Sequence, residues 1–328
     1  MLFSKIIGNE FSKQILLKLI AGHKIPHAML FMGPSGVGKR QFALELAKGI
    51  LGVEHSRKID SGHHPDVRIF YPEGKTGMHP MTSIHQLQEQ MSLEPFEASS
   101  RVFIIDDADR MLSTSSNALL KTLEEPEERN YLILLTHDPE SIISTIQSRC
   151  RKIPFFSIAE KELCQFVKTH FSKSDVDAKR IAFLSHGSLQ KAMDLVERPC
   201  DPKRELLIEL LSAASFNATQ HGPHIAKLEQ LILDKTSDDY DPMKFQRDVD
   251  QILEEIFYWY RDLHLLSLGA SPDLAFHLDH LQLLQGRVNS ELPSLESVGW
   301  LLEECRLAIQ RSVKLKTTFE YLFSQLVI

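Results

Sequence analysis

The sequence of 328 residues has few cysteines and no long apolar run. Its four cysteines form no C-x-x-C pair, which argues against a zinc ribbon or a thioredoxin-like redox site. So few cysteines in a chain of this length suit a reducing compartment. No apolar run approaches the roughly 18 residues that cross a bilayer, and Lys5 and Glu10 interrupt the segment where a signal peptide would be apolar. We therefore expect a cytoplasmic protein without membrane contact.

A strong excess of basic charge is also missing. The chain holds 37 Lys and Arg against 44 Asp and Glu, and in residues 201–328 acidic groups outnumber basic ones by 20 to 12. A tight, autonomous nucleic-acid binder would need a basic surface. Weak DNA contact within a larger assembly stays open. The apolar share of 43% and the charged share of 25% are typical of globular proteins and exclude a disordered or fibrous chain.

Short apolar runs alternate with helical patterns up to about residue 155. The strand candidates are His27–Met32, Val67–Tyr71, Arg101–Ile105, Tyr131–Leu135 and Cys150–Pro154. Uniformly apolar strands separated by helices predict a parallel sheet covered on both faces, and therefore an α/β fold. In such sheets, ligands bind at the carboxyl ends of the strands.

After Pro154 the periodicity is helical throughout. Residues 159–171, 175–185 and 189–197 predict three short helices, and Lys244–Leu268 predicts a long one. Pro202, Pro242 and Pro272 each follow Asp or Ser, a pattern typical of the first turn of a helix. We expect an α/β domain over 1–155, a small helical lid domain over 156–200 and an all-α domain over 201–328.

The segment GPSGVGKR, Gly33–Arg40, follows a strand candidate and opens a helix candidate. That is the context of a phosphate-binding loop. Its glycines let backbone N–H groups face phosphate oxygens, and the helix N-terminus adds a positive dipole. Lys39 is expected to lie against the β- and γ-phosphates. The alternative is a glycine turn that only joins strand to helix.

Arg40 departs from the pattern of an active phosphate loop. Magnesium needs the hydroxyl of Ser or Thr at this position, whereas a guanidinium has no acceptor atom and a fixed positive charge. The carboxylate Asp106, after the apolar run 102–105, matches the metal-supporting acid of the second nucleotide motif, unless the acids merely cap the next helix. Asp107 is one methylene shorter than the Glu that orients the attacking water in ring ATPases.

The candidate nucleotide site is therefore a degenerate one. It consists of Gly33, Pro34, Ser35, Gly36, Val37, Gly38, Lys39, Arg40, Asp106, Asp107 and Thr136. We expect weak binding of ATP or ADP at most, and no hydrolysis of the magnesium nucleotide by this chain. Thr136, at the end of YLILL, is either a nucleotide sensor or a plain hydroxyl at the end of a strand.

Five segments resemble the delta-prime branch of the bacterial DNA polymerase III clamp-loader subunits, within the AAA+ superfamily. They are HAMLFMGPSGVGK, SGHHPDV (61–67), VFIIDDADRM (102–111), NALLKTLEEP (117–126) and SRCR (148–151). NALLKTLEEP is the most specific of these. The motifs cover about residues 1–155, and the helical parts behind them agree in layout only.

The resemblance implies a role in loading the sliding clamp onto primed DNA. It implies gamma/tau and delta subunits as partners in a hetero-oligomer, and a closed collar formed by the C-terminal helices. Arg149 matches the arginine finger that completes a neighbour's ATP site in trans, where a guanidinium spreads charge over the transferring phosphoryl oxygens. The chain would be an accessory subunit of a DNA-directed DNA polymerase, a nucleotidyltransferase by association, without ATPase activity of its own.

The sequence also departs from that family. The segment Leu51–Asp66 contains no cysteine where the family often carries a four-cysteine zinc module. We expect no zinc, and expect His55, His63 and His64 to be solvated loop residues. The sensor arginine of the lid would fall near Gln190.

Two rival functions stay open. The first is an active ATPase subunit of gamma/tau type. The second is a stand-alone P-loop nucleotide kinase, which gives no reason for NALLKTLEEP or the helical tail. The aromatic run Phe257–Tyr260 lies in a helical pattern without flanking Lys or Arg, so core packing or a subunit seam is favoured over base stacking.

Overall fold

The computed structural model describes residues 2–73, 77–197, 202–213, 215–233, 242–288, 292–311 and 313–326. The chain divides into two compact units, Met1–Glu197 and Arg198–Ile328. Among the described residues, no helix combines the length and apolar character needed to span a bilayer.

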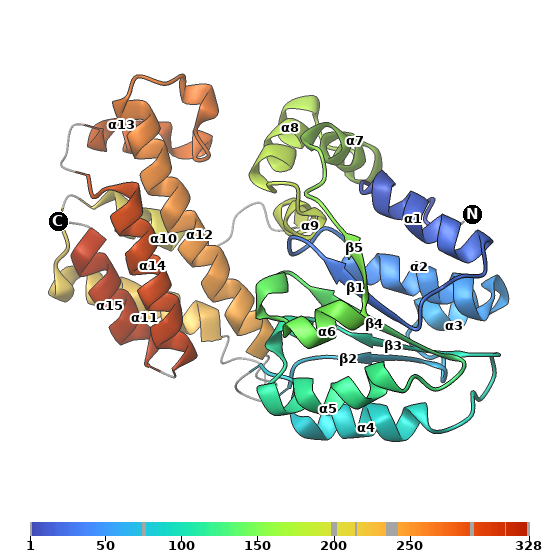
Figure 1. The fold of residues 1–328 in the computed structure, drawn as a ribbon. Helices are drawn as coiled ribbons and strands as arrows, with labels where there is room; N and C mark the ends of the chain where they lie inside the picture. The colour runs from blue at the N-terminus through green and yellow to red at the C-terminus, as the bar shows by residue number, and fades with distance from the viewer. Residues whose placement is uncertain are drawn as a thin grey trace. The chain divides into compact units, whose positions relative to one another are not determined.

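The first unit is built on a five-stranded sheet (Figure 1). Its strands are β1 (Ala28–Met32), β2 (Val67–Phe70), β3 (Arg101–Ile105), β4 (Asn130–Thr136) and β5 (Arg151–Pro154), in the order β2-β3-β4-β1-β5. All neighbouring pairs are parallel. The α/β class and the parallel sheet predicted from the apolar runs are confirmed.

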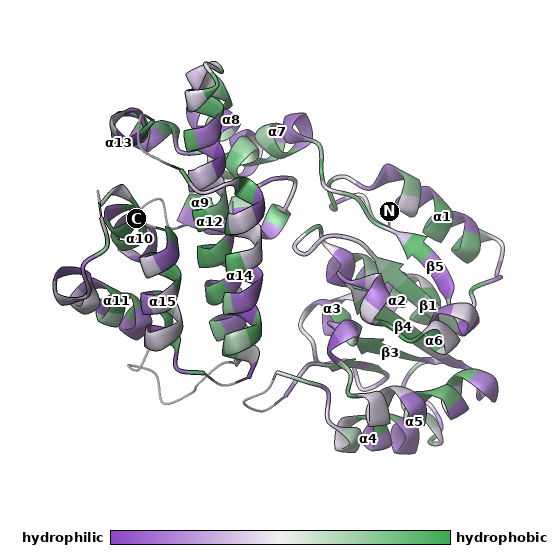
Figure 2. Ribbon diagram, turned by 60° about the vertical axis from the view of Figure 1, so that its left-hand side comes forward, coloured by the Kyte–Doolittle hydropathy of each residue, from purple (hydrophilic) through white to green (hydrophobic). Residues whose placement is uncertain are grey.

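Helices cover both faces of this sheet. The helices of this part are α1 (Glu10–Ala21), α2 (Lys39–Leu51), α3 (Ser56–Asp60), α4 (Met81–Met91), α5 (Ser113–Glu124) and α6 (Ser144–Arg149). One buried cluster joins α1, α2 and α3 to alternate strand residues such as Phe31 and Ile133, and another joins α4, α5 and α6 to Leu30 and Leu132. Figure 2 shows the apolar strands between these layers. Strands that are buried on both faces account for the continuous apolar runs.

Three further helices complete the first unit. They are α7 (Glu160–Phe171), α8 (Asp175–Leu184) and α9 (Leu189–Glu197), close to the ranges expected. They share a small core of their own around Leu163, Val167 and Ala182. Ile7 and Leu189 pack against that core. The finer division at residues 155 and 200 stays a prediction, because the compact unit runs from residue 1 to 197.

The second unit is helical in the part that the structure describes. Its helices are α10 (Pro202–Ser212), α11 (Ala218–Leu233), α12 (Pro242–Ser267), α13 (Leu281–Arg287), α14 (Leu295–Gln310) and α15 (Leu315–Leu326). Its described part also has the 3₁₀ turns η4 (Pro272–Leu274) and η5 (Leu278–His280), and the first unit has η1 (Val53–His55), η2 (Ala108–Arg110) and η3 (Pro139–Ser141). Pro202, Pro242 and Pro272 each begin an element, as their sequence context predicted.

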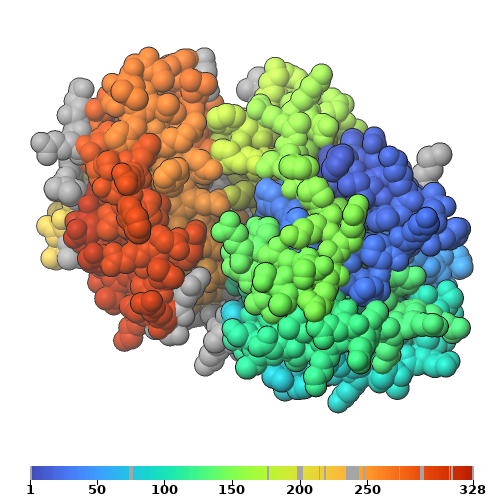
Figure 3. All heavy atoms as spheres, in the orientation of Figure 1, coloured from blue at the N-terminus to red at the C-terminus, as the bar shows by residue number. Residues whose placement is uncertain are grey.

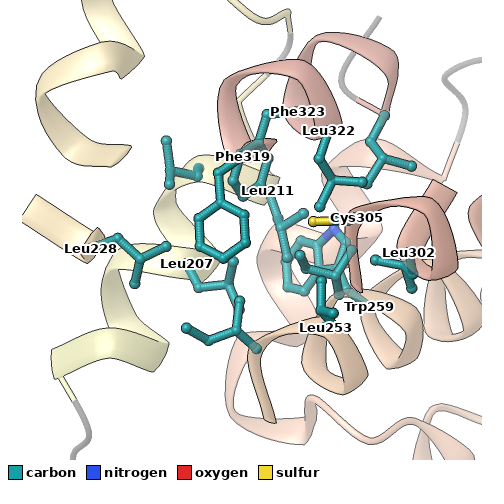
Figure 4. Close-up of a cluster of buried hydrophobic side chains, with 14 of the residues drawn as sticks. Leu207, Leu211, Leu228, Leu253, Trp259, Leu302, Cys305, Phe319, Leu322 and Phe323 are labelled. Atoms are coloured by element: carbon teal, nitrogen blue, oxygen red, sulfur yellow. The ribbon is translucent and has the colours of Figure 1, made fainter. Parts of the chain in front are cut away.

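The core of the second unit draws on several helices (Figure 4). Trp259 and Phe319 are fully buried in it, and Tyr260 donates a hydrogen bond of 2.7 Å to the carbonyl oxygen of Leu326. The preference for core packing over base stacking is therefore confirmed for Trp259 and Tyr260. Phe319, Leu322 and Phe323 of α15 pack into this core of the chain itself, and the collar with other subunits stays a prediction.

Candidate functional site

The glycine loop runs from the end of β1 to the start of α2, as predicted. At Gly33 a Cβ atom would lie 2.1 Å from the carbonyl oxygen of Phe155, so only glycine fits there. Gly36 has a φ of +75° and a Cβ built on it would lie 2.0 Å from Ser188 Oγ. Val37 is buried, whereas Pro34 and Ser35 are exposed. The loop is thus wedged between β5 and the start of α9.

Lys39, the first residue of α2, lies against the loop itself. Its ammonium donates hydrogen bonds to the carbonyl oxygens of Gly33 at 2.6 Å and Pro34 at 2.8 Å. Burial lowers the pKa of Lys39 to about 8, although the nearby carboxylates of Asp107 and Asp106 act in the opposite direction. The cation therefore sits in a poorly solvated place, where a phosphate group would be a strong partner.

Arg40 lies beside the acid that would support a metal. Its Nη1 atom is 3.6 Å from Asp106 Oδ2, and its Cζ atom is 5.9 Å from the centre of the Tyr71 ring. The guanidinium thus supplies a fixed positive charge next to the carboxylate. The residues present do not fit a magnesium ion, because the expected hydroxyl ligand is replaced by a cation that holds the carboxylate.

Asp106 directly follows β3 and lies near the charged groups of Asp107, Arg40 and Lys39, while His79 contacts its backbone. Burial and the neighbouring Asp107 raise the pKa of Asp106, while Arg40 and Lys39 oppose this rise. Nε2 of His79 lies 2.7 Å from the Asp106 carbonyl oxygen, which can only accept, so Nε2 carries the proton. Burial lowers the pKa of His79, which keeps its ring neutral behind the carboxylate.

Thr136, His137 and Asp109 form one hydrogen-bonded group. Thr136, the buried last residue of β4, donates a hydrogen bond of 2.7 Å to Asp109 Oδ1. His137 Nδ1 lies 3.2 Å from Asp109 Oδ2 and 3.9 Å from Asp107 Oδ1. Asp107 itself has a left-handed backbone with a φ of 48°. Thr136 is therefore linked to Asp109, a residue that the sequence reasoning had not singled out.

The start of α9 closes on the glycine loop. The backbone N–H of Gln190 donates to the Gly36 carbonyl oxygen at 3.2 Å. The side chain of Gln190 turns along its own helix and donates to Asp194 Oδ1 at 3.2 Å. The start of α9 thus contacts the glycine loop through a backbone hydrogen bond at Gln190, the position where the resemblance led us to expect a sensor residue.

Arg149 belongs to a different part of the first unit. It is the last residue of α6, before β5, and its side chain is 36% exposed. Its Nη2 atom donates to Glu124 Oε1 at 2.7 Å, and its Nη1 atom donates to the Thr145 carbonyl oxygen at 3.1 Å. Figure 3 shows the green segment around α6 at the surface. The following Cys150 is buried, and burial raises the pKa of its thiol to about 12.

The predicted residues thus fall into two places. Gly33 to Arg40, Asp106, Asp107 and Thr136 gather at the carboxyl ends of β1, β3 and β4, whereas Arg149 ends α6. Sequence reasoning missed Tyr71, His79, Asp109, His137 and Glu124. His79 and Tyr71 carried no signal, because they approach the site from loops. Asp109 and Glu124 lie inside quoted motifs, DDADRM and NALLKTLEEP, and could have been found there.

The segment that replaces the zinc module is held by hydrogen bonds. His64 is buried, so the expectation of a solvated ring is wrong for this residue. Its Nδ1 atom accepts from the backbone N–H of Asp66, so Nε2 carries the proton and donates to His55 Nδ1 at 3.0 Å. Glu97, the third possible ligand nearby, pairs with Lys58 at 2.6 Å. These three groups already have partners, and the absence of zinc stays a prediction.

The fold and the motif positions define a class. A parallel sheet with a glycine loop between β1 and α2 and carboxylates after β3 is the arrangement of a P-loop domain. A solved DNA polymerase III gamma subunit-related protein from Thermotoga maritima matches with a TM-score of 0.50 and 17% identity, over 94% of this chain and 97% of that one. At this identity the likeness concerns the fold alone.

Sequence comparison identifies the family. Residues 8–159 match the family described as "DNA polymerase III, delta subunit". The DNA polymerase III subunit delta' of Bacillus subtilis is 34% identical over 46% of this chain and 48% of its own length. The DNA polymerase III subunit gamma of Buchnera aphidicola from Schizaphis graminum is 30% identical over 72% of this chain and 68% of its own length. The chain belongs to the family of DNA polymerase III clamp-loader subunits.

The relatives include both the delta-prime and the gamma/tau types. The chain spans about half the length of the first curated relatives it matches, 48% of the delta' subunit and 50% of the tau subunit of Bacillus subtilis.

Proposed function

We propose that this chain is a clamp-loader subunit of delta-prime type, which lacks ATP hydrolysis of its own and lends Arg149 to the ATP site of a neighbouring subunit. Its work is to help place a sliding clamp on primed DNA. The proposed partners are gamma/tau and delta subunits, with the clamp and DNA reached through the complex. In this role it would act in the cytoplasm, with domains at 1–155, 156–200 and 201–328.

The observation that carries the proposal is the pair of Arg40 and Asp106, 3.6 Å apart. An active P-loop ATPase uses both of these positions for magnesium. The position of Arg40 would hold a hydroxyl ligand, and the position of Asp106 would hold a free carboxylate. Here a guanidinium stands in place of the hydroxyl and neutralises the carboxylate. Hydrolysis would also need a water-orienting group, and Asp107 is short for that task.

The glycine loop is still suited to binding phosphate. Its backbone and the Lys39 ammonium suit a phosphate chain, and the low pKa of Lys39 reflects a cation short of solvation. We propose weak nucleotide binding that does not depend on magnesium.

The proposed role of Arg149 rests on its chemistry and its place. A guanidinium offers five N–H donors, and its contacts with Glu124, Thr145 and Ser148 use three of them. The side chain is exposed enough to meet a triphosphate held by another subunit. An arginine finger is worth about a thousandfold or more in rate.

ATP turnover by the isolated chain tests the degenerate site. We expect no turnover above background at saturating ATP and magnesium, and nucleotide affinity that is unchanged by EDTA. Magnesium-dependent turnover clearly above background would contradict the proposal and favour the gamma/tau rival or the kinase rival. The native mass of the complex separates those two, because a kinase has no need of large partners.

A further inference from the structure

The arginine finger is held by a residue of the NALLKTLEEP segment. Glu124 is the last residue of α5 and Arg149 is the last residue of α6. Nη2 of Arg149 donates to Glu124 Oε1 at 2.7 Å, and Nη1 donates to the Thr145 carbonyl oxygen one turn back along α6. Two anchors on two helices therefore fix the plane of one guanidinium.

Glu124 stands at an unfavourable place for a carboxylate. The carboxyl end of a helix carries partial negative charge, which disfavours acidic side chains in the last turn. The next residue, Glu125, is acidic too and forms the C-cap of α5. Arg149 supplies the positive charge that offsets Glu124, and in return its own position is set by that carboxylate.

The ion pair contributes little to the stability of the fold. The side chains are 36% exposed for Arg149 and 50% exposed for Glu124, and exposed pairs of this kind are weak in water. What the pair does control is the freedom of a long side chain. Ordering such a side chain at an interface costs free energy, and a side chain that is already ordered avoids much of that cost.

We propose that Glu124 is the positioning residue of Arg149. It holds the guanidinium in the orientation that meets the neighbouring subunit's triphosphate, and it acts on the reaction only through Arg149. The inference rests on the proposed function of Arg149. A carboxylate this close could also have the opposite effect, by repelling the triphosphate, and the two effects differ in sign.

The test uses the reconstituted clamp-loader complex, with each variant introduced into this chain alone. The variants are Glu124→Ala, Glu124→Gln, Arg149→Ala and the double variant Glu124→Ala/Arg149→Ala. Glu125→Ala is the matched control, because it removes the adjacent carboxylate on the same helix end. The readouts are kcat and KM for ATP in the presence of clamp and primed DNA, with assembly of each complex checked by its mass.

We expect Glu124→Ala to lower kcat at the site that this chain completes about threefold to tenfold, with KM nearly unchanged. Glu124→Gln keeps an acceptor oxygen and should retain most of the rate. Glu125→Ala should match the parent chain. The double variant should be no slower than Arg149→Ala, because Glu124 has no effect once the guanidinium is gone.

Other outcomes overturn one proposal or the other. If Arg149→Ala lowers the rate and Glu124→Ala leaves it unchanged or raises it, Glu124 does not position the finger, although the finger itself stands. A further fall in the double variant would mean that Glu124 acts independently of Arg149. If Arg149→Ala has no effect, the proposed function itself fails. Should Glu124→Ala not assemble, Glu124→Met alone and combined with Arg149→Ala gives the same comparison, because methionine has a similar length and no acceptor oxygen.

Discussion

Arg40 is the residue at which the candidate nucleotide site departs from an active phosphate loop. Position 40 follows the lysine of the glycine loop, and a hydroxyl there would serve as a metal ligand. Arg40 instead forms an ion pair with Asp106 and lies over the Tyr71 ring. The backbone shape of a phosphate loop is therefore kept, although position 40 offers no magnesium ligand.

Arg40→Thr should therefore restore part of the lost chemistry. We expect magnesium to tighten ATP binding to the isolated variant about tenfold or more, because a hydroxyl ligand is present and Asp106 has lost its guanidinium partner. Hydrolysis should stay at background, because Asp107 is unchanged. Isothermal titration with and without magnesium measures the effect. Arg57→Thr, a change at an exposed arginine of α3, serves as control, and equal magnesium dependence in both variants would speak against the assignment.

Sequence reasoning worked well where a residue's role follows from its neighbours in the chain. Gly33 to Lys39 could be assigned because strand, loop and helix are consecutive. Thr136 could be placed at the end of a strand, but not its partner, since its bond to Asp109 spans two elements. His64 was misjudged because its burial depends on Asp66 and His55, and polar character alone does not reveal burial.

At the scale of elements, two sets of hydrogen bonds join loops of the first unit to elements far away in the sequence. Asp66, just before β2, accepts hydrogen bonds from the backbone N–H groups of Phe96, Glu97 and Ala98, and also from Arg101. The start of α9 approaches the glycine loop at Gly36. Each contact joins a loop residue to partners far away in the sequence, so neither follows from periodicity.

Asp66→Asn should destabilise the first unit by about 2 kcal/mol at pH 7, because an amide cannot accept all of these N–H donors. Burial alone would raise the pKa of Asp66, but the N–H donors and Arg101 bring it below the usual value. The stabilisation is therefore fully present above pH 4 or so and is lost as the pH falls through the lower pKa of the folded state. Urea unfolding at pH 7 and at pH 3 measures the difference.

The difference in the free energy of unfolding between Asp66→Asn and the parent chain should be smaller at pH 3 than at pH 7. Glu94→Gln, an exposed change in the loop whose N–H groups donate to Asp66, should have little effect at either pH. A gap that stayed constant from pH 7 to pH 3 would mean that the Asp66 charge is not what holds the loop.

Gly36→Ala tests the contact between the loop and α9. The added methyl group would lie 2.0 Å from Ser188 Oγ and 3.0 Å from Gln190 Cβ, so Ser188 must give up its bond to the Lys191 N–H or the start of α9 must shift, at about 1–3 kcal/mol beyond the cost of the backbone conformation. Gly62 has nearly the same φ, +74°, with open space around it, and Gly62→Ala reports the backbone cost alone. Chemical denaturation of both variants gives the difference. Equal losses would show that α9 does not press on the loop.

At the scale of the whole molecule, the chain combines an α/β unit with a helical unit that has its own core. Apolar periodicity predicted that the second unit is helical, and the prolines predicted three of its starts. The packing of its helices could not be predicted, because helical periodicity gives the buried face of a helix but not its partner. Tyr260, for example, meets the carbonyl oxygen of Leu326 across 66 residues of sequence.

Phe319→Ala should destabilise the second unit by about 3–5 kcal/mol, the usual cost of a cavity left by a buried phenylalanine. Both tryptophans, Trp259 and Trp300, lie in this unit, so tryptophan fluorescence reports its unfolding alone. Hydrogen exchange at β1, β3 and β4 follows the first unit in the same sample. The substitution should shift the fluorescence transition to lower denaturant and leave hydrogen exchange in the sheet unaltered. An equal loss of stability in both units would mean that the chain unfolds as one unit.

The central claim is that this chain completes another subunit's ATP site and does not hydrolyse ATP at its own. The most direct measurement is the rate of ATP hydrolysis by the reconstituted complex, with clamp and primed DNA, when only this chain carries Arg149→Ala. Arg151→Ala, at an exposed arginine two residues further on, is the control. We predict that Arg149→Ala removes the contribution of one ATP site and impairs clamp loading while the complex still assembles, and that Arg151→Ala does neither. Unchanged hydrolysis and loading with Arg149→Ala would contradict the account.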